Sequence, residues 1–521
     1  MEGKAVGTAE AEITEGIRAA MNVLLVYPEH PDTFWSFRHA VRVTTKRAVF
    51  PPLGLLTVAS MLPEEWQKRL VDMNTDRLRD KDISWADLVF VSAMVIQRES
   101  ARNVIARCKK LGVRVVAGGP LFTSEPDEFK DADHLVLDEA ETTLPMFLGD
   151  LEKGSASPIY TSQERPDMST VPLPMWSLID PKKYVQMSFQ YSRGCPFDCD
   201  FCNIGVLNGK SVRTKAKEQI LAELDALYDR GWRSGVFVVD DNFIGNKKKL
   251  KAEILPAMIE WQKAKRYPFS LSTQVSINLS DDEELMHLLS AAGFDGVFVG
   301  VESPNEDSLA ECNKHQNEHR DLVGSIKKLQ NHGLQVQAGL ILGFDSDPVS
   351  VFKSQIKLVQ QSGIVMAMVG LLNAPRGTRL FKRMERENRL TEDKATGDNT
   401  DGSMNFVPKM ERGTLTKGYL EVLRTLYSPG AYYRRIGTFF HEYRPRSKRG
   451  MSQLELWQVT AWIRSLWIMG VRDSARRHYW QFMLATLFKR PWSFPLSITL
   501  AVYGYHFRAV LRRLEHTSAA N

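Results

Sequence analysis

Cysteines and long apolar runs are both scarce in this sequence of 521 residues. No stretch approaches about 18 consecutive apolar residues, so we expect no membrane-spanning helix. The opening residues 1–20 lack the basic start and apolar core of a secretion signal, and we interpret them as a loose tail. Only five cysteines occur, an odd number in a long chain, which argues against a disulfide framework and favours a reducing, cytoplasmic location.

A strong overall charge is also lacking, since the formal net charge is +6. With 43% hydrophobic and 25% charged residues, the chain has the composition of a folded protein, and its length indicates about three domains. Residues 431–521 hold 15 Lys and Arg against 4 Asp and Glu, together with five of the eleven tryptophans. The positive charge therefore lies at the C-terminal end of the chain.

Short apolar runs alternate with helical stretches in the first part of the chain. The runs are NVLLVY (22–27), KRLVDMN (68–74), ADLVFVSAM (86–94), VRVVAGGP (113–120) and HLVLDE (134–139). This alternation is typical of βα units that build a parallel sheet covered on both faces, so we predict a doubly wound domain over residues 21–150. In such a sheet, ligands bind beyond the carboxyl ends of the strands.

A segment rich in Pro, Ser and Thr, residues 151–186, follows this domain and is interpreted as a linker. Between residues 187 and 385, six further apolar runs separated by helical segments predict a partial (β/α) barrel, whose working face lies at the carboxyl ends of its strands. The strand pattern fades after residue 385, and we predict a mainly helical, basic and Trp-rich region over residues 386–521. The predicted fold class is therefore α/β with a helical C-terminal region.

Cys195, Cys199 and Cys202 form a CxxxCxxC motif directly after the first predicted strand of the barrel-like region. Three thiolates on one short loop can bind three irons of a four-iron, four-sulfur (4Fe-4S) cluster and leave the fourth iron open to another ligand. A structural zinc site needs four ligands, and no nearby Cys or His supplies the fourth. We therefore predict that these cysteines are catalytic and hold a 4Fe-4S cluster, whereas Cys108 and Cys312 are more typical of packing residues.

With this motif the sequence resembles the radical S-adenosylmethionine (SAM) enzymes, in which the methionine part of SAM binds the open iron. The resemblance covers residues 185–385 and implies that polar groups and glycines at the strand ends bind SAM. Ser272 and Gln274 also occupy alternating positions of one strand, so they share a face suited to ribose hydroxyls. The residues expected to bind SAM are Asp240, Asp241, Asn242, Ser272, Gln274, Glu302, Gly339, Ile341, Gly343 and Pro375.

A doubly wound domain upstream of such a barrel resembles the cobalamin-binding module of this superfamily. The resemblance rests on FPPLGLLTVAS (50–60), GGP (118–120) and DEAET (138–142). The motif DxHxxG is missing, and His30, His39 and His134 lie in other contexts, so a base-off cobalamin without a histidine ligand is implied. A nucleotide-binding domain, which lacks its GxGxxG motif here, and a purely structural domain stay alternatives. The residues expected to bind cobalamin are Leu53, Gly54, Ser92, Gly118, Gly119, Glu141 and Thr142.

Together these resemblances imply a cobalamin-dependent radical SAM methyltransferase. In that family SAM is cleaved reductively at the cluster to a 5'-deoxyadenosyl radical, which removes hydrogen from a substrate carbon that then receives the methyl group of methylcobalamin. A second SAM remethylates the corrinoid, and flavodoxin or ferredoxin supplies electrons. The methylthiolating enzymes of transfer RNA are disfavoured, because the first domain holds a single cysteine, Cys108.

The substrate is expected to be a hydrophobic small molecule or a lipid. Length, architecture and the basic, Trp-rich end resemble the hopanoid C-2 methylases, which act on a membrane triterpenoid, so hopanoid C-2 methylation is the leading hypothesis. Methylation or oxidative cyclisation of another hydrophobic metabolite, such as a tetrapyrrole intermediate, is the second enzyme hypothesis. An iron-sulfur electron-transfer adaptor at the membrane is the alternative from another class of protein.

Residues 451–515 allow two interpretations. Tryptophans and arginines surround the run FPLSITLAVYGYHF, a composition that suits a helix lying in a membrane interface and attracted by anionic lipid. The alternative is an ordinary helical cap over the barrel. Nucleic-acid binding is disfavoured, because the aromatic residues belong to no recognised module. We therefore expect a cytoplasmic protein and leave peripheral contact with the inner face of the membrane open.

Overall fold

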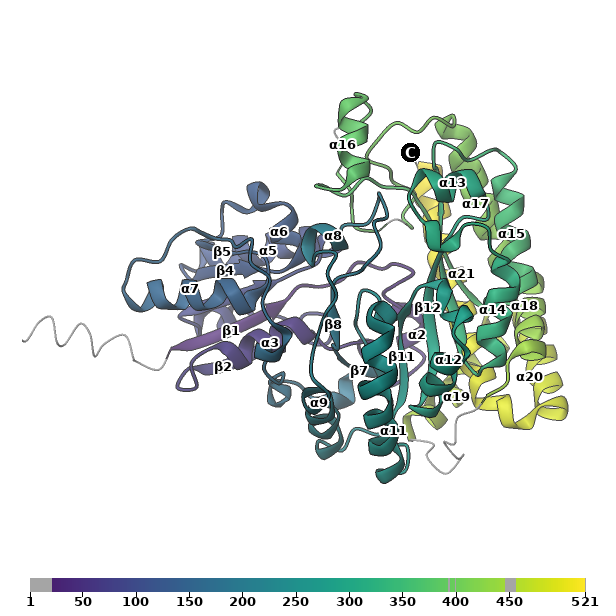
Figure 1. The fold of residues 1–521 in the computed structure, drawn as a ribbon, viewed down its shortest axis with the longest axis horizontal. Helices are drawn as coiled ribbons and strands as arrows, with labels where there is room; N and C mark the ends of the chain where they lie inside the picture. Colours follow the sequence, from purple (N-terminus) through teal and green to yellow (C-terminus); the bar gives the residue numbers. More distant parts are fainter. Residues whose placement is uncertain (1–20, 392–393, 399, 446–455, 521) are drawn as a thin grey trace, which may run out of the picture. The chain divides into compact units, whose positions relative to one another are not determined.

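The computed structural model describes residues 21–391, 394–398, 400–445 and 456–520, so the predicted tail over residues 1–20 lies outside the described residues. The chain forms two compact units (Figure 1). The first contains the described residues up to Pro31 together with Pro52–Asp180, and the second contains Asp32–Pro51 and the described residues from Pro181 onward.

The first unit is built on a six-stranded parallel sheet with the strand order β2-β1-β3-β4-β5-β6. Its strands are β1 (Asn22–Tyr27), β2 (Gln67–Asp72), β3 (Leu88–Ser92), β4 (Arg114–Gly118), β5 (His134–Val136) and β6 (Ile159–Tyr160). The longer connecting helices are α3 (Leu53–Met61), α5 (Arg98–Lys110) and α7 (Ala140–Glu152), and the shorter ones α4 (Asp80–Ser84) and α6 (Pro120–Ser124).

Strand β1 shows why this sheet is covered on both faces. Its side chains alternate between two apolar clusters, with Leu24 and Val26 in one and Val23 and Leu25 in the other. Helix α5 packs in the first cluster, which also contains the fully buried Cys108, and helices α3 and α7 pack in the second. This arrangement confirms the predicted doubly wound architecture.

Strand β6 lies inside the segment that the sequence analysis interprets as a linker. It pairs with β5 through Leu135–Ile159 and Val136–Tyr160 and adds the sixth strand to the sheet. A strand of two residues is too short to produce an alternating pattern, which explains why the sequence gives no sign of it. The rest of the segment, including the buried Trp176, belongs to the first unit up to Asp180.

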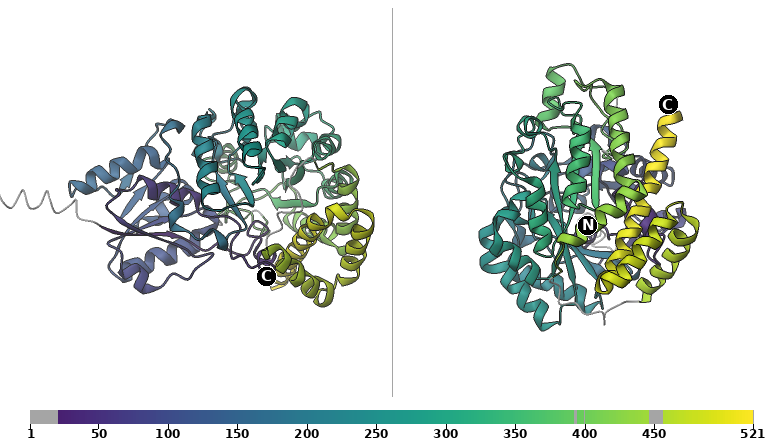
Figure 2. Two further views of the ribbon diagram at one scale, coloured as in Figure 1. Left: turned by 90° about the horizontal axis from the view of Figure 1, so that it is seen from below. Right: turned by 90° about the vertical axis from the view of Figure 1, so that its right-hand side faces the viewer.

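The second unit contains another six-stranded parallel sheet, with the order β14-β13-β12-β11-β10-β7. Its strands are β7 (Gln186–Phe189), β10 (Gly235–Val238), β11 (Ser270–Val275), β12 (Phe294–Glu302), β13 (Gln335–Leu342) and β14 (Met366–Leu371). The main helices between them are α9 (Lys217–Asp229), α11 (Leu255–Ala264), α12 (Glu283–Ala291), α14 (Leu322–Asn331) and α15 (Val351–Ser362), which surround the strands in Figure 2. These strands and helices confirm the predicted β/α architecture of this region.

The C-terminal part of the second unit is helical, as predicted. Its elements are α16 (Arg379–Arg386), α17 (Arg412–Tyr427), α18 (Pro429–Glu442), α19 (Leu456–Trp467), the π-helical turn η12 (Ile468–Arg472), α20 (Arg476–Lys489), η13 (Pro491–Ser493) and α21 (Phe494–Ala520). Helices α17 and α18 pack against α15 of the β/α layer. Within the described ranges, no helix is both long and apolar enough to cross a membrane.

The segment Asp32–Pro51, which the sequence analysis includes in the first domain, packs with the second unit. Its short helix α2 (Arg38–Val41) contacts α21, and the Phe34 ring stacks on Phe507 with 5.3 Å between ring centroids. The backbone N–H of Arg47 donates to the carbonyl of Lys183 at 2.8 Å. The second unit therefore includes one segment from the N-terminal part of the chain.

Arg435 on α18 is completely buried and joins the helical layer to the sheet. Its guanidinium donates to the Leu426 carbonyl at 2.8 Å and to the Val365 carbonyl at 3.2 Å, and it lies over the Tyr432 ring at 5.2 Å from the centroid. Burial lowers the pKa of this guanidinium. Both carbonyls lose this donor if the side chain is removed.

We expect Arg435→Ala to destabilise the second unit by about 3 kcal/mol, because it leaves a cavity and two buried carbonyls without this donor. The neighbouring exposed Arg434 provides a matched control, and Arg434→Ala should change stability by less than about 0.5 kcal/mol. Thermal unfolding followed by circular dichroism measures both variants. Equal unfolding midpoints for the two would contradict the role given to Arg435.

Candidate functional site

The three motif cysteines lie on a closed loop after β7. The loop starts at β8 (Ser192–Arg193) and returns through β9 (Arg213–Thr214), and the two short strands pair antiparallel. Gly194 opens the loop with φ of 92°, and a Cβ there would lie 2.5 Å from the Ser211 carbonyl oxygen. Only glycine fits this turn, because both the backbone conformation and the available space exclude a side chain.

Cys195, Cys199 and Cys202 are half-buried and near enough to one another for their sulfurs to interact electrostatically. Burial raises the pKa of all three thiols, to about 12 at Cys202. In the part of the chain that the structure describes, no three His, Cys, Asp or Glu side chains converge on a point that could hold a single metal ion. A 4Fe-4S cluster does not need such convergence, because each thiolate binds a different iron, so the three thiols fit this cofactor.

Two carboxylates after β10 hold the start of the cysteine loop. Asp240, fully buried, accepts hydrogen bonds from the backbone N–H of Tyr191 at 2.8 Å and the hydroxyl of Ser192 at 2.5 Å. Asp241 accepts from the Gly194 N–H and from the Asn208 amide, both at 2.9 Å. Burial raises the pKa of Asp240 to about 7. Both residues, predicted to bind SAM, therefore contact the cysteine loop, and their role toward SAM stays a prediction.

Asp200, between the second and third cysteines, fastens the middle of the loop. Its carboxylate accepts from the Asn313 amide at 2.6 Å and from Arg379 at 2.9 Å. Its backbone N–H donates to the Cys312 carbonyl, and its own carbonyl accepts from the N–H of Leu380, each at 3.0 Å. These bonds of Asp200, the Asp200 clasp, join the loop to the residues after β12 and to helix α16. No motif in the sequence predicts them.

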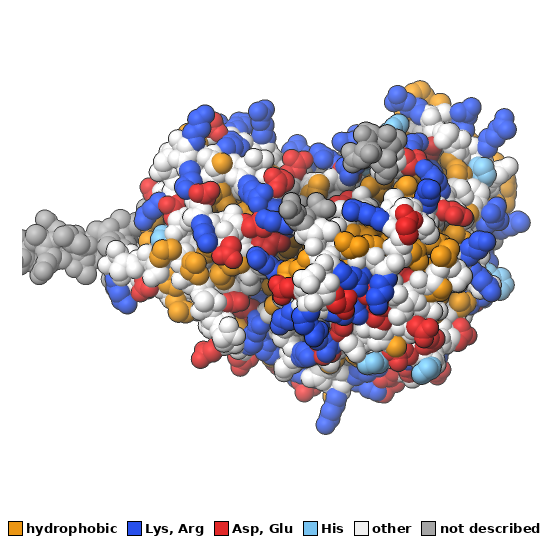
Figure 3. Space-filling model, turned by 90° about the horizontal axis from the view of Figure 1, so that it is seen from above, with side chains coloured by type: hydrophobic (Ala, Val, Ile, Leu, Met, Phe, Trp, Pro, Cys, Tyr) orange, Lys and Arg blue, Asp and Glu red, His pale blue; other side chains and the backbone are white. Residues whose placement is uncertain are grey.

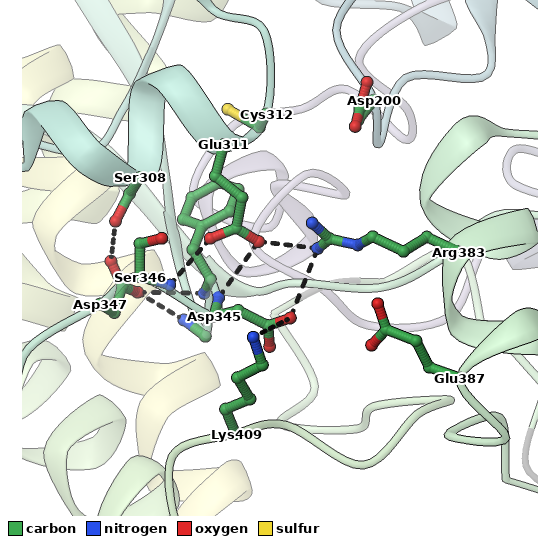
Figure 4. Close-up of polar contacts among 12 residues, drawn as sticks. Asp200, Ser308, Glu311, Cys312, Asp345, Ser346, Asp347, Arg383, Glu387 and Lys409 are labelled. Carbon is green, nitrogen blue, oxygen red and sulfur yellow. Dashed lines mark hydrogen bonds and ion pairs between the residues drawn. The ribbon is translucent and has the colours of Figure 1, made fainter.

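A second polar network, drawn in Figure 4, braces the loop after β13. Glu311 accepts from the backbone N–H groups of Asp345 and Ser346 and pairs with Arg383 at 2.7 Å. Asp347 accepts from the N–H of Gly343 at 2.8 Å. This network fixes the end of β13, where the sequence analysis expects contacts with the adenine of SAM.

The other predicted SAM residues of the second unit lie on one face or one edge of its sheet. Ser272 and Gln274 are half-buried on the same face of β11. Gln274 pairs in register with Phe298 of the neighbouring strand β12. The Phe298 ring in turn lies close to Gly339 of β13, because a Cβ at Gly339 would be 3.1 Å from it. Because the strands are parallel, the remaining predicted residues come together at the carboxyl edge, after β10, β12, β13 and β14; they are Asn242, Glu302, Ile341, Gly343 and Pro375.

Lys314 is a buried cation beside the cysteines that the sequence analysis missed. Its ammonium pairs with Glu302 at 2.7 Å, and a Cβ at Gly300 would lie 2.3 Å from the Glu302 carboxylate, so Gly300 makes room for the pair. Burial alone would lower the pKa of Lys314, but the Glu302 carboxylate and the Cys199 sulfur raise it above its usual value. A lysine close to Cys312 in the sequence gives no pattern by which this placement could be predicted.

The predicted cobalamin residues of the first unit gather at the carboxyl edge of its own sheet. Ser92 and Gly118 pair in register where β3 and β4 end. Gly119 follows with φ of 94°, and a Cβ there would lie 2.6 Å from the Ser92 hydroxyl oxygen. Leu53 and Gly54 begin α3, whereas Glu141 and Thr142 lie in the first turn of α7. Gly118 and Gly119 carry no side chain at the end of β4, so the backbone there leaves room for the close approach of a flat corrinoid.

The three histidines of the N-terminal region are engaged elsewhere. His134 begins β5, in register with Val116 in the middle of β4, and its ring bonds the Ser157 carbonyl at 2.8 Å. Burial lowers the pKa of His30 to about 4, and its ring contacts the Tyr27 hydroxyl at 3.3 Å. His39 belongs to the second unit and pairs with Asp32 at 2.8 Å.

We expect Arg379→Ala to weaken retention of a reconstituted cluster by about tenfold, because partners behind metal ligands fix the ligand geometry. Arg386 lies at the other end of the same helix and is exposed, so Arg386→Ala is the matched control. Iron remaining after a timed challenge with chelator measures the effect. Equal retention in the two variants would show that the clasp does not support the cysteine loop.

Three family models match the chain. Residues 40–148 match the B12 binding domain, residues 189–351 the radical SAM superfamily, and residues 378–519 a domain of unknown function, DUF4070. The solved structure of TsrM from Kitasatospora setae, a radical SAM methyltransferase with cobalamin and a 4Fe-4S cluster bound, is similar to this chain with a TM-score of 0.59. The match covers 96% of this chain and all of TsrM. At 14% identity, this likeness shows the fold alone.

Two curated relatives are similar over almost their whole length. The chain is 39% identical to the uncharacterized methyltransferase sll1242 of Synechocystis sp., over 94% of this chain and 91% of the relative. It is 31% identical to the hopanoid C-2 methylase of Rhodopseudomonas palustris, over 91% of each. With the three-cysteine loop and the two parallel sheets, these matches remove the electron-transfer adaptor as an alternative. The chain belongs to the cobalamin-binding radical SAM methyltransferase family and is a radical SAM methyltransferase.

Proposed function

We propose that this enzyme methylates a hopanoid lipid at C-2. The observation that carries the proposal is the 31% identity to a hopanoid C-2 methylase over 91% of both chains. When bound, the cluster, SAM and a base-off cobalamin supply the radical and methyl-transfer chemistry. Electrons come from flavodoxin or ferredoxin. The protein's own residues hold these groups, orient the substrate and keep water away from the reacting carbon.

An aromatic surface on the inner face of the second sheet supports a hydrophobic substrate. Phe237 pairs in register with Ser272, and Phe298 pairs with Gln274, so aromatic and polar side chains share one face of neighbouring strands. If Ser272 and Gln274 bind the ribose of SAM, these rings would offer an apolar substrate a surface on the same face of the sheet. Such a mixture of apolar wall and few polar groups is typical of small-molecule sites.

The segment Asp32–Pro51 adds two aromatic rings to this surface. Trp35 contacts Phe298 with 5.1 Å between ring centroids, and Phe50 contacts Phe237 at 5.2 Å. The two residues nevertheless stay 42% and 37% exposed, so part of their surface is available to a ligand. A rigid, fused-ring lipid can cover such rings without losing conformational entropy of its own.

The direct test is anaerobic reconstitution followed by incubation with a reductant, SAM, methylcobalamin and a hopanoid that lacks the C-2 methyl group. We expect 5'-deoxyadenosine and a C-2-methylated hopanoid, and Cys199→Ala should abolish both because the cluster loses a ligand. Mass spectrometry measures both products. Methylation of a tetrapyrrole but of no hopanoid, by enzyme with verified cluster and cobalamin, would overturn the substrate assignment and leave the reaction class intact.

We expect Trp35→Ala to raise the KM for the lipid by about tenfold, while 5'-deoxyadenosine formation without lipid stays unchanged, because the ring contacts substrate rather than the cluster loop. Trp35→Phe keeps an aromatic surface and should restore most of the affinity. Steady-state kinetics in detergent micelles measure both variants. An unchanged KM in Trp35→Ala would exclude this residue from the substrate site.

A further inference from the structure

Helices α19 and α20, with the turns η12 and η13, expose an unusual number of large apolar side chains. Of the nineteen large hydrophobic residues that are exposed in the described ranges, nine lie between residues 459 and 492. They include Trp467, Phe488 and Trp492, which are 60%, 81% and 83% exposed. Single exposed apolar side chains need no explanation, but a concentration of this kind marks an interaction surface.

These side chains form two stripes at helical spacing. In α19 and η12, Val459, Ile463, Trp467 and Val471 follow one another at intervals of four residues. In α20 the corresponding positions are Trp480, Leu484, Leu487 and Phe488.

The two stripes meet at one point. The Trp480 indole N–H donates to the Gly470 carbonyl at 2.9 Å, beside the end of the first stripe. The same elements also have buried sides, which contain Met469 in η12 and Tyr479 and Met483 in α20. The exposed stripes are therefore additional to the packing of these helices, which lie at the surface in the lower right of the left-hand view of Figure 2.

The charges around the stripes are almost all positive. Between residues 456 and 492, six Lys and Arg occur against one acidic residue, Asp473. Asp473 is buried and pairs with Arg508 at 2.6 Å, so it does not offset the exposed positive charge. The face shown in Figure 3 differs, since acidic and basic side chains are interspersed there as on an ordinary solvated surface.

We propose that this surface, the α19–η13 surface, docks on the headgroup layer of an anionic lipid membrane. Exposed tryptophans beside arginines and lysines suit the boundary between headgroups and acyl chains, where an indole ring has both an apolar and a polar environment. Anionic headgroups complement the positive charge. A nucleic acid would use the basic groups but leave the Ile, Leu, Val and Phe side chains in water, so the membrane accounts for more of the surface.

The test uses the full-length, cofactor-loaded protein and vesicles without hopanoid. We expect it to co-sediment with vesicles of phosphatidylcholine and phosphatidylglycerol, and more weakly with phosphatidylcholine alone. The triple variant Trp467→Ser, Phe488→Ser, Trp492→Ser should bind the anionic vesicles at least about tenfold more weakly. Val349 and Val407 are exposed hydrophobic residues outside this surface, so Val349→Ser, Val407→Ser is the matched control and should bind like the unchanged protein.

A charge variant distinguishes electrostatic attraction to anionic lipid from nonspecific hydrophobic adsorption. Arg476→Gln, Arg477→Gln should weaken binding to the anionic vesicles, with little change for the neutral ones, and raised salt should act in the same direction. Circular dichroism confirms that each variant is folded. Equal binding of the triple variant and the control to anionic vesicles would overturn the proposal. A triple variant that binds vesicles like the unchanged protein, but no longer self-associates or no longer binds DNA, would overturn it as well.

The membrane-docking proposal and the proposed hopanoid substrate can be refuted independently of each other. Vesicle binding involves neither turnover nor hopanoid, so it holds for a methylase of another hydrophobic metabolite. A protein that methylates hopanoid in detergent but ignores anionic vesicles would refute the docking surface alone.

Discussion

The site depends on hydrogen bonds between two neighbouring strand ends. Asp240 and Asp241, directly after β10, hold the backbone at Tyr191 and Gly194, where the cysteine loop begins. Carboxylate oxygens can accept several N–H and O–H donors at once, and the strands β7 and β10 beneath them pair within one sheet. The burial that raises the pKa of Asp240 also shields these bonds from competing water. The start of the cysteine loop is thereby held in a defined geometry.

Much of the fold could be predicted from the sequence because both sheets are parallel. Most of their strands are rich in apolar residues and stand out against the helices between them. Strand β6 is the exception, since its two residues join a sheet edge without a run of their own. The packing of Asp32–Pro51 with the second unit was also not predictable, because the partners of this segment lie far away in the sequence, from Lys183 to Phe507.

The site was predictable only where a local motif marks it. The CxxxCxxC spacing identifies the cysteines because the ligands of one cluster must lie on one loop. The Asp200 clasp follows no such rule, since its partners Asn313 and Arg379 come from different elements and depend on the finished fold. The pair of Glu302 and Lys314 also forms only when Gly300 leaves space, which is a property of the strand register rather than of composition.

Exposed aromatic side chains favour aggregation unless they serve a purpose, and the second unit keeps them in two chemically different settings. On the sheet, Trp35 and Phe50 contact aromatic residues that pair with the polar residues of β11. The proposed site requires this combination, because it has to orient an apolar molecule next to a charged cofactor. On the α19–η13 surface, Trp467 and Trp492 stand among cations, as a headgroup layer requires. The proposed lipid substrate would explain both settings, because an enzyme for such a substrate has to reach it in a membrane and then hold it away from water.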